Sequence, residues 1–89
     1  MQKVEMYIKR SCGYCFAAKN LLLQNNIPYL EIALDDEPHR MQEMIDRSGR
    51  MTVPQVFING QSIGGFMELN ALQQNGELAA VLAAGDEES

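Results

Sequence analysis

The chain lacks tryptophan and is poor in cysteine, proline and histidine, with two, three and one of these residues. It also has no apolar run of the roughly 18–20 residues that a membrane-spanning helix needs. Two cysteines are too few for the disulfide framework of a small secreted domain. The N-terminal segment is interrupted by Lys3, Glu5, Lys9 and Arg10. We therefore expect no secretory leader, no contact with a membrane and a cytoplasmic location.

Positive charge is scarce as well. Seven Lys and Arg residues oppose 12 Asp and Glu residues, which gives a formal net charge of -5. Such a balance argues against general affinity for nucleic acid. Residues 1–20 have the opposite balance and contain both cysteines, with Lys9, Arg10 and Lys19 close by. Surface charges can fall this way by chance, but positive charge beside a thiol pair favours thiolate over thiol.

The 89 residues suffice for one small domain. A chain of this length buries roughly 60–65% of the surface that its unfolded form exposes, so it forms a single modest core. The composition is that of an ordinary globular protein, which excludes a collagen or a disordered chain. We expect one domain over residues 1–85 and an acidic flexible tail over residues 86–89.

The spacing of apolar residues predicts strand and helix in the first half of the chain. Residues 3–8 alternate as a strand does, and a helix then begins at Tyr14 and ends at Asn25-Asn26. Residues 29–34 form a second strand. The expected buried positions are Val4, Met6 and Ile8, then Ala18, Leu21 and Leu22, then Leu30, Ile32 and Leu34.

Turn residues mark the elements of the second half. Asp35-Asp36-Glu37-Pro38 begins a helix that buries Met41, Met44 and Ile45 and ends at Gly49. Two short strands, Gln55–Ile58 and Gln61–Ile63, flank Asn59-Gly60, the strongest hairpin signal in the chain. A helix using Phe66, Leu69 and Leu72 follows, and a last helix ends at Gly85.

The expected order is β-α-β-α-β-β-α-α, an α/β fold class. A β-α-β unit joins two parallel strands by a right-handed crossover. The hairpin adds antiparallel strands. We therefore predict one mixed four-stranded sheet flanked by helices.

The two cysteines form one C-x-x-C pair, Cys12-Gly13-Tyr14-Cys15, between the first strand and the first helix. Residues three apart share a helix face, so the two sulfurs can form a disulfide. Cys12 falls near the helix N-cap, where free N–H groups and the helix dipole stabilise an anion. We expect Cys12 to be the attacking thiolate and Cys15, one turn further in, to be the resolving thiol.

Two other interpretations of the pair are open to the residues alone. The cysteines could be buried apolar filler, or they could bind zinc. Zinc normally takes four ligands, but the chain has one histidine, His39, and no second C-x-x-C. We expect His39 on the surface of the second helix and no zinc site within one chain.

Two further segments have sequence patterns that are found at binding sites. Thr52-Val53-Pro54 precedes the third strand. A cis proline there would make a tight turn and leave the Val53 backbone free to pair with an extended peptide, while a trans proline is the simpler reading of this segment alone. Gly64-Gly65 before a helix is a candidate anion site, although many turns use two glycines.

Together these segments resemble the glutaredoxins, a family of the thioredoxin-like superfamily. The resemblance covers roughly residues 2–83 and depends on the order and spacing of its motifs. These are Tyr7-x-Lys9-x-x-Cys12-x-Tyr14-Cys15, Thr52-Val53-Pro54-Gln55-Val56-Phe57-Ile58 and Gly64-Gly65. Thioredoxin itself is less similar, because no tryptophan precedes Cys12. The resemblance implies a thioredoxin-like fold and a cis Val53–Pro54 bond.

The resemblance also implies a groove for glutathione. Lys9 should meet a glutathione carboxylate, Tyr14 should flank the cysteinyl sulfur, and the Val53 backbone should pair with the tripeptide. The N–H groups from Gly65 onward would receive the γ-glutamyl carboxylate. The implied glutathione residues are Lys9, Tyr14, Thr52, Val53, Pro54, Gly65, Phe66 and Met67.

The chain departs from the family pattern in three places. Gly13 stands where the family commonly has proline. Phe66-Met67-Glu68 stands where the family commonly has aspartate soon after the two glycines, and the acidic residue comes one position later. Met41, between Arg40 and Gln42, occupies a position that is Arg or Gln in many members.

Three functions follow as hypotheses. The first is a monomeric glutathione-dependent oxidoreductase that reduces glutathionylated and disulfide-bonded proteins. The second is a dimer in which Cys12 of each subunit and two glutathiones hold a [2Fe–2S] cluster, because some glutaredoxins with a non-proline residue before Tyr do so. The third is a redox-linked module that binds a protein through the Phe66-Met67 surface.

Overall fold

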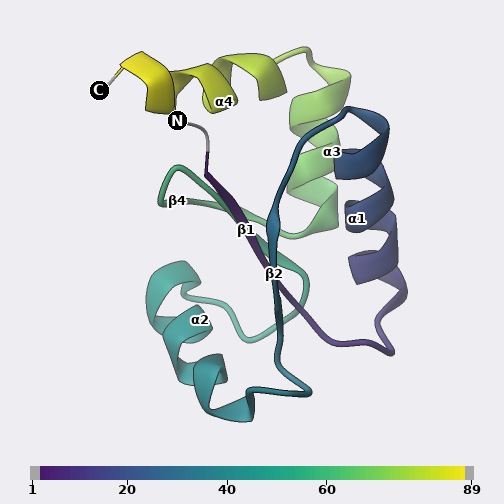
Figure 1. The fold of residues 1–89 in the computed structure, drawn as a ribbon, viewed down its shortest axis with the longest axis vertical. Helices are drawn as coiled ribbons and strands as arrows, with labels where there is room; N and C mark the ends of the chain where they lie inside the picture. Colours follow the sequence, from purple (N-terminus) through teal and green to yellow (C-terminus); the bar gives the residue numbers. More distant parts are fainter. Residues whose placement is uncertain (1–2, 88–89) are drawn as a thin grey trace.

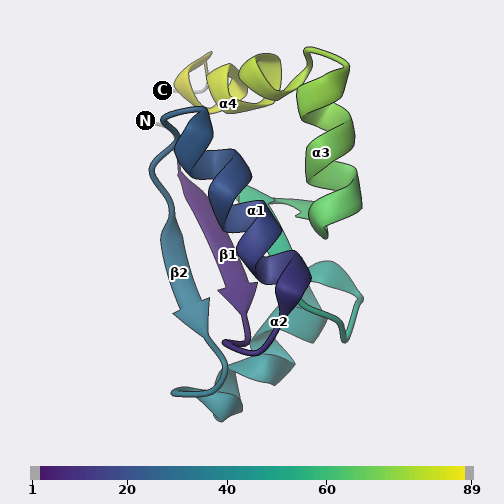
Figure 2. The same ribbon diagram turned by 90° about the vertical axis from the view of Figure 1, so that its right-hand side faces the viewer.

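The computed structural model describes residues 3–87 and has the expected order of elements, with one added 3₁₀ turn before the second helix. Figures 1 and 2 show their arrangement. The elements are β1 (Val4–Ile8), α1 (Gly13–Gln24), β2 (Leu30–Ala33), η1 (Pro38–Arg40), α2 (Met41–Ser48), β3 (Gln55–Ile58), β4 (Gln61–Gly64), α3 (Phe66–Gln74) and α4 (Leu78–Glu87).

The strands form one mixed sheet in the order β2-β1-β3-β4. β1 and β2 are parallel, while β3 is antiparallel to both β1 and β4. The β3–β4 turn places Asn59 and Gly60 at φ values of 53° and 85°, as a two-residue type I′ hairpin requires. The predicted mixed four-stranded sheet is confirmed.

The side of the sheet that faces α1, α3 and α4 holds the larger apolar core (Figure 2). Alternation along β1 and β3 points every second side chain to this side, where the helices bury them. This core contains Val4, Met6, Ile8, Cys15, Ala18, Leu21, Leu22, Ile27, Val56, Ile58, Leu69, Leu78 and Leu82. Cys15 is part of it, so the second thiol is embedded in the fold.

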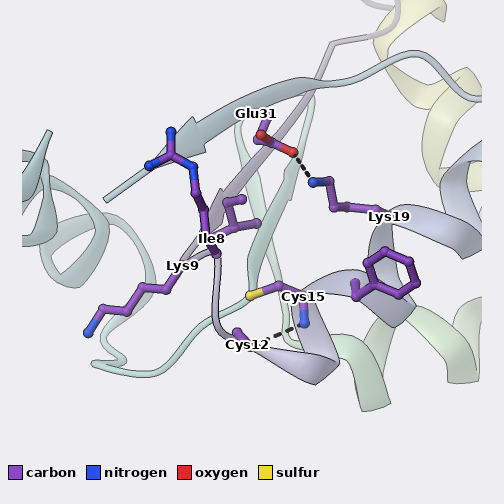
Figure 3. A pocket seen from close by; sticks show the side chains of 8 residues that line it. Ile8, Lys9, Cys12, Cys15, Lys19 and Glu31 are labelled. Atoms are coloured by element: carbon purple, nitrogen blue, oxygen red, sulfur yellow. Dashed lines mark hydrogen bonds and ion pairs between the residues drawn. The ribbon is translucent and has the colours of Figure 1, made fainter. Parts of the chain in front are cut away.

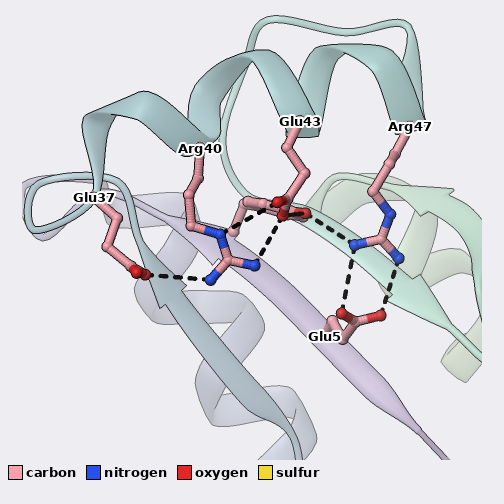
Figure 4. Close-up of polar contacts among 6 residues, drawn as sticks. Glu5, Glu37, Arg40, Glu43 and Arg47 are labelled. Carbon is pink, nitrogen blue, oxygen red and sulfur yellow. Dashed lines mark hydrogen bonds and ion pairs between the residues drawn. The ribbon is translucent and has the colours of Figure 1, made fainter.

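The opposite side of the sheet is covered by α2 and is partly polar (Figure 4). Met44 packs there against residues of the sheet. Beside it, Arg47 donates to both oxygens of Glu5 and to the Tyr7 hydroxyl, and its guanidinium lies 4.0 Å from the centre of the Phe57 ring. These contacts tie α2 to β1 and β3, and so hold the strand that leads into the cysteine pair.

Arg40 and Glu43 extend the same polar cluster (Figure 4). Arg40 bonds Glu37 and Glu43, and Glu43 accepts the Tyr7 hydroxyl. Burial, and then the hydrogen bond to Glu43, raise the pKa of Tyr7. Arg40 first, and the Tyr7 hydroxyl second, lower the pKa of Glu43.

Two predictions about the elements need correction. Leu30 is 56% exposed, because β2 is an edge strand and, of residues 30–34, the core under α2 includes only Ile32 and Leu34. The last helix continues through Gly85 to Glu87, since one glycine costs a helix only about 1 kcal/mol. Residues 88–89 of the expected tail lie outside the described residues.

Candidate active site

Cys12 lies at the N-cap of α1, as its position in the sequence predicts. Its backbone is extended, with φ -94° and ψ 116°, and its Sγ accepts the Cys15 N–H at 3.2 Å. The Cys12 thiol also donates to the Val53 carbonyl oxygen, at 3.6 Å. Free N–H groups at a helix start stabilise negative charge on the capping atom. The geometry is therefore suited to a nucleophilic thiolate at Cys12.

Cys15 lies one turn further along α1 and is only 2% exposed. Both cysteines are free thiols. Burial, reinforced by the hydrogen bond with Cys12, raises the pKa of Cys15 to about 12. Cys15 is thus a protonated thiol at neutral pH, whereas Cys12 lies at the surface end of the pair.

Acidic side chains neutralise more of the positive charge near the thiols than the sequence suggests. Arg10 pairs with Asp36, and its backbone N–H donates to Asp35. Lys19 pairs with Glu31 at 2.7 Å. Lys9, by contrast, forms no ion pair with the side chains of residues 3–84. The sheet brings acidic residues of β2 and its following turn beside α1, an effect that counting along the chain misses.

A groove lies beside Cys12, between α3 and the segment that precedes β3. Its volume is about 310 Å³. The Val53–Pro54 bond in its wall is cis, as the resemblance implies. The Tyr14 and Phe66 rings stack at 6.1 Å. The groove is lined by Tyr14, Arg50, Thr52, Val53, Pro54, Gly65, Phe66, Met67 and Glu68.

The groove brings together the implied glutathione residues except Lys9. Lys9 instead lines a second pocket with Cys12 and Cys15 (Figure 3). The three residues around Met41 are also outside the groove. Met41, the first residue of α2, packs against the core between α2 and the sheet, and its neighbours Arg40 and Gln42 bond acidic side chains of the same segment.

Two groove residues, Arg50 and Glu68, were not among the expected site residues. The Gly65 N–H, expected to receive a ligand carboxylate, donates to Glu68 at 2.7 Å. Arg50 donates to the same carboxylate oxygen, also at 2.7 Å. The Gly65 N–H first, and Arg50 second, lower the pKa of Glu68.

A sequence signal exists for one of these two residues. Glu68 follows Gly65 by three positions, the spacing of a helix capping box. Arg50 is distant in sequence and reaches Glu68 only through the fold. His39 is exposed, as expected, although it lies in η1 rather than in α2.

No helix within residues 3–87 is both long enough and apolar enough to span a membrane.

The mixed sheet, the cis proline and the C-x-x-C pair at a helix start define a thioredoxin-like protein suited to thiol–disulfide exchange.

Comparison with known proteins identifies the family. The family model described as Glutaredoxin matches residues 4–63. The chain is 45% identical over 82 residues to glutaredoxin 3 of Escherichia coli (strain K12), covering 92% of this chain and 99% of that protein. The chain belongs to the glutaredoxin family, and is thus a glutathione-dependent oxidoreductase with a C-x-x-C active site.

Solved structures agree with this assignment. The crystal structure of the buckwheat glutaredoxin–glutathione complex matches with a TM-score of 0.85 and 31% identity, over 96% of this chain and 80% of that one. The holo form of glutaredoxin C1 from Populus tremula x tremuloides matches with a TM-score of 0.84 and 35% identity, over 93% and 78% of the two chains.

Proposed function

We propose that this protein reduces glutathionylated proteins and protein disulfides, with Cys12 as the nucleophile and Cys15 as the resolving thiol. The position of Cys12 carries the proposal. Its sulfur caps α1 and lies 3.6 Å from the carbonyl oxygen of Val53, and Val53 lines the groove. A disulfide held in the groove therefore comes within reach of the sulfur that the helix start stabilises.

With a glutathionylated protein, the reaction needs only Cys12. The Cys12 thiolate attacks the glutathione sulfur, and a Cys12–glutathione disulfide forms as the bond to the protein sulfur breaks. The protein leaves as a thiolate and takes a proton from solvent. A second glutathione thiolate then attacks the bound glutathione sulfur, which yields oxidised glutathione and restores Cys12.

With a protein disulfide, the reaction also needs Cys15. Cys12 first forms a mixed disulfide with one substrate sulfur. Cys15 then attacks Cys12, the Cys12–Cys15 disulfide forms, and the substrate leaves fully reduced. Glutathione returns the pair to its thiol form. The free energy of this exchange is small because glutaredoxin potentials lie close to the glutathione potential.

Glutathione itself is proposed to lie in the groove beside Tyr14, Thr52, Val53 and Pro54. Support comes from the buckwheat glutaredoxin, which is crystallised with glutathione. The backbone of Val53, just before β3, is proposed to pair with the tripeptide as an added strand does. Lys9 is proposed to meet a glutathione carboxylate from the other side of Cys12.

The γ-glutamyl carboxylate is proposed to bind near Gly65, Phe66 and Met67. Because Glu68 already accepts the Gly65 N–H, the ligand must either displace Glu68 or use the N–H groups that follow. Replacing Glu68 by Gln keeps a hydrogen-bond acceptor but removes the competing charge. We expect Glu68→Gln to change the KM for glutathione more than kcat.

The main test compares the wild-type protein with Cys12→Ser and Cys15→Ser. Each is assayed with glutathione on a glutathionylated peptide and on a peptide disulfide. We expect Cys12→Ser to lose both activities, and Cys15→Ser to lose only the reduction of the peptide disulfide. Full activity of Cys12→Ser on either substrate would contradict the proposal.

The proposed partners are glutathione and glutathionylated or disulfide-bonded proteins in a reducing compartment such as the cytoplasm. A [2Fe–2S] cluster shared by two subunits stays a separate hypothesis. In that hypothesis Cys12 of each subunit and two glutathiones hold the cluster, and the visible spectrum of anaerobically purified protein with glutathione tests it.

A further inference from the structure

A second pocket lies beside the thiols (Figure 3) and shares no lining residue with the groove. Its volume is about 190 Å³, which is room for several water molecules at about 30 Å³ each. Three segments meet around it: the loop after β1, the first turns of α1, and β2. Its titratable lining consists of Lys9, Arg10, Cys12, Cys15, Lys19 and Glu31.

Cys15 lines this pocket and not the glutathione groove. Cys12 lines the same pocket, but its thiol also contacts the carbonyl oxygen of Val53, a residue of the groove. Cys12 lies at the end where substrate is proposed to bind, whereas the buried Cys15 sulfur borders the small charged pocket behind it. While substrate fills the groove, the proton of Cys15 can be transferred into this pocket.

The attack of Cys15 on Cys12 requires such a proton to leave. Burial keeps Cys15 in its thiol form at neutral pH by raising its pKa to about 12. A thiolate, not a thiol, is the effective nucleophile in disulfide exchange. The thiol proton must therefore pass to an acceptor as the sulfur attacks.

Glu31 is the one carboxylate that lines the pocket among residues 3–84, the range whose side chains the structure describes. Lys9, Arg10 and Lys19 are cations there and only donate. Lys19 reaches from α1 to Glu31 Oε1 at 2.7 Å (Figure 3). No side chain among residues 3–84 bonds the second Glu31 oxygen, Oε2, so it can accept a hydrogen bond from water in the pocket.

We propose that Glu31, held in place by Lys19, accepts the proton of Cys15 through water in this pocket when Cys15 resolves a mixed disulfide. The inference rests on the proposed dithiol reaction and adds its proton acceptor. Glu31 does not touch the reacting sulfurs. It accepts the proton through water, while the Cys15 sulfur forms the new bond to Cys12.

The step balances as follows. The Cys15–Cys12 sulfur bond forms while the bond between Cys12 and the substrate sulfur breaks. The substrate sulfur leaves with the electron pair as a thiolate and is protonated by solvent. The Cys15 proton moves to Glu31. When glutathione later reduces the Cys12–Cys15 disulfide, the Cys15 thiolate that is released recovers a proton by the same route.

The experiment isolates this step by single turnover. Reduced protein is mixed with a peptide disulfide in the absence of glutathione, quenched with acid, and analysed by mass spectrometry for the Cys12–Cys15 disulfide. A glutathionylated peptide, which needs only Cys12, is the internal reference. Glu31→Gln keeps the size of the side chain but removes its capacity to take the proton.

We expect Glu31→Gln to slow formation of the Cys12–Cys15 disulfide by about 10- to 100-fold, at the lower end of general acid–base effects. The reaction with the glutathionylated peptide should stay within about twofold of wild type. Glu31→Asp should recover part of the rate, because it keeps a carboxylate. Glu77→Gln, the same change at an exposed site outside this pocket, should alter neither reaction.

Lys19→Met separates proton acceptance from simple loss of the ion pair. It breaks the same pair but leaves the carboxylate, so we expect a smaller loss than in Glu31→Gln. The proposal is overturned if Lys19→Met matches Glu31→Gln, if Glu31→Asp recovers nothing, or if Glu31→Gln slows both substrates equally or neither. Inactive wild-type protein would instead contradict the proposed function.

Discussion

The two faces of the sheet are stabilised by different chemistry. The face under α1, α3 and α4 buries aliphatic side chains around Leu22 and Leu69. The face under α2 buries a carboxylate, Glu5, and the hydroxyl end of Tyr7 together with the arginine that satisfies them. The reactive pair belongs to the first face, with Cys15 inside the core and Cys12 at its edge.

The difference shows how a chain of 89 residues positions a reactive thiol. Apolar packing is dense but carries no directional information, and it fixes α1 against the sheet. Hydrogen bonds and ion pairs are directional, and they fix how α2 sits against β1 and β3. The first face should therefore account for more of the stability, and the second for part of its dependence on pH.

The largest expected contrast lies within the cysteine pair. At a pH of about 8, iodoacetamide should add one group to the folded protein, at Cys12, because Cys15 is buried and its pKa is raised to about 12. Mass spectrometry of the intact protein counts the adducts. Folded Cys12→Ser should take up none and unfolded Cys12→Ser one. Two rapid adducts on the folded wild type would show that Cys15 is not shielded.

The apolar face is tested by Leu22→Ala. Leu22 is fully buried, so the cavity should lower the free energy of unfolding by about 3 kcal/mol. Urea denaturation followed by circular dichroism measures the change. Leu23→Ala removes the same atoms from the same helix at a side chain that is 61% exposed, and should have little effect. Equal losses in the two variants would show that this face is not the main core.

The polar face is tested by Arg47→Met. Glu5, which is 8% exposed, would lose its bidentate partner. We expect a loss of about 2 kcal/mol, below the range for fully buried pairs because Arg47 is itself partly exposed. Arg10→Met breaks an exposed pair and should change the stability little. The double variant Glu5→Leu/Arg47→Met should recover part of the loss.

The smallest expected effect is the loss of stability of the α2 face of the sheet at acid pH. Arg40, and then Tyr7, lower the folded-state pKa of Glu43. Its contribution to stability is therefore present above the unfolded value of about 4.3 and is lost as the pH falls through the lowered folded value. Glu43→Gln should flatten the decline of the unfolding midpoint between about pH 5 and 3. An unchanged decline would place the acid sensitivity elsewhere.

Much of the fold could be predicted from local patterns. Alternation along Val4–Ile8 and the Asn59-Gly60 turn are short-range features, and so is the position of Cys12 at the start of α1. Leu30 could not be placed in the same way, because its pattern is that of a buried strand while its exposure depends on how far α2 extends.

The site divides along the same line. Local spacing identified Cys12 and Cys15 and drew attention to the segment around Pro54, and the resemblance added that the Val53–Pro54 bond is cis. Arg50 carries no local signal, because its contact with Glu68 spans 18 positions. The excess of positive charge counted near the thiols was also misleading, since Asp36 and Glu31 come from other parts of the chain to balance it.

The sequence by itself determined the elements, their order, the thiol pair and its place at a helix N-terminus, because each depends on residues within a few positions of one another. Tertiary structure decided which cations near the thiols are paired, and that Glu68 already accepts the Gly65 N–H. It also placed Glu31 on the pocket behind Cys15. Burial and charge pairing depend on neighbours that only the folded sheet brings together.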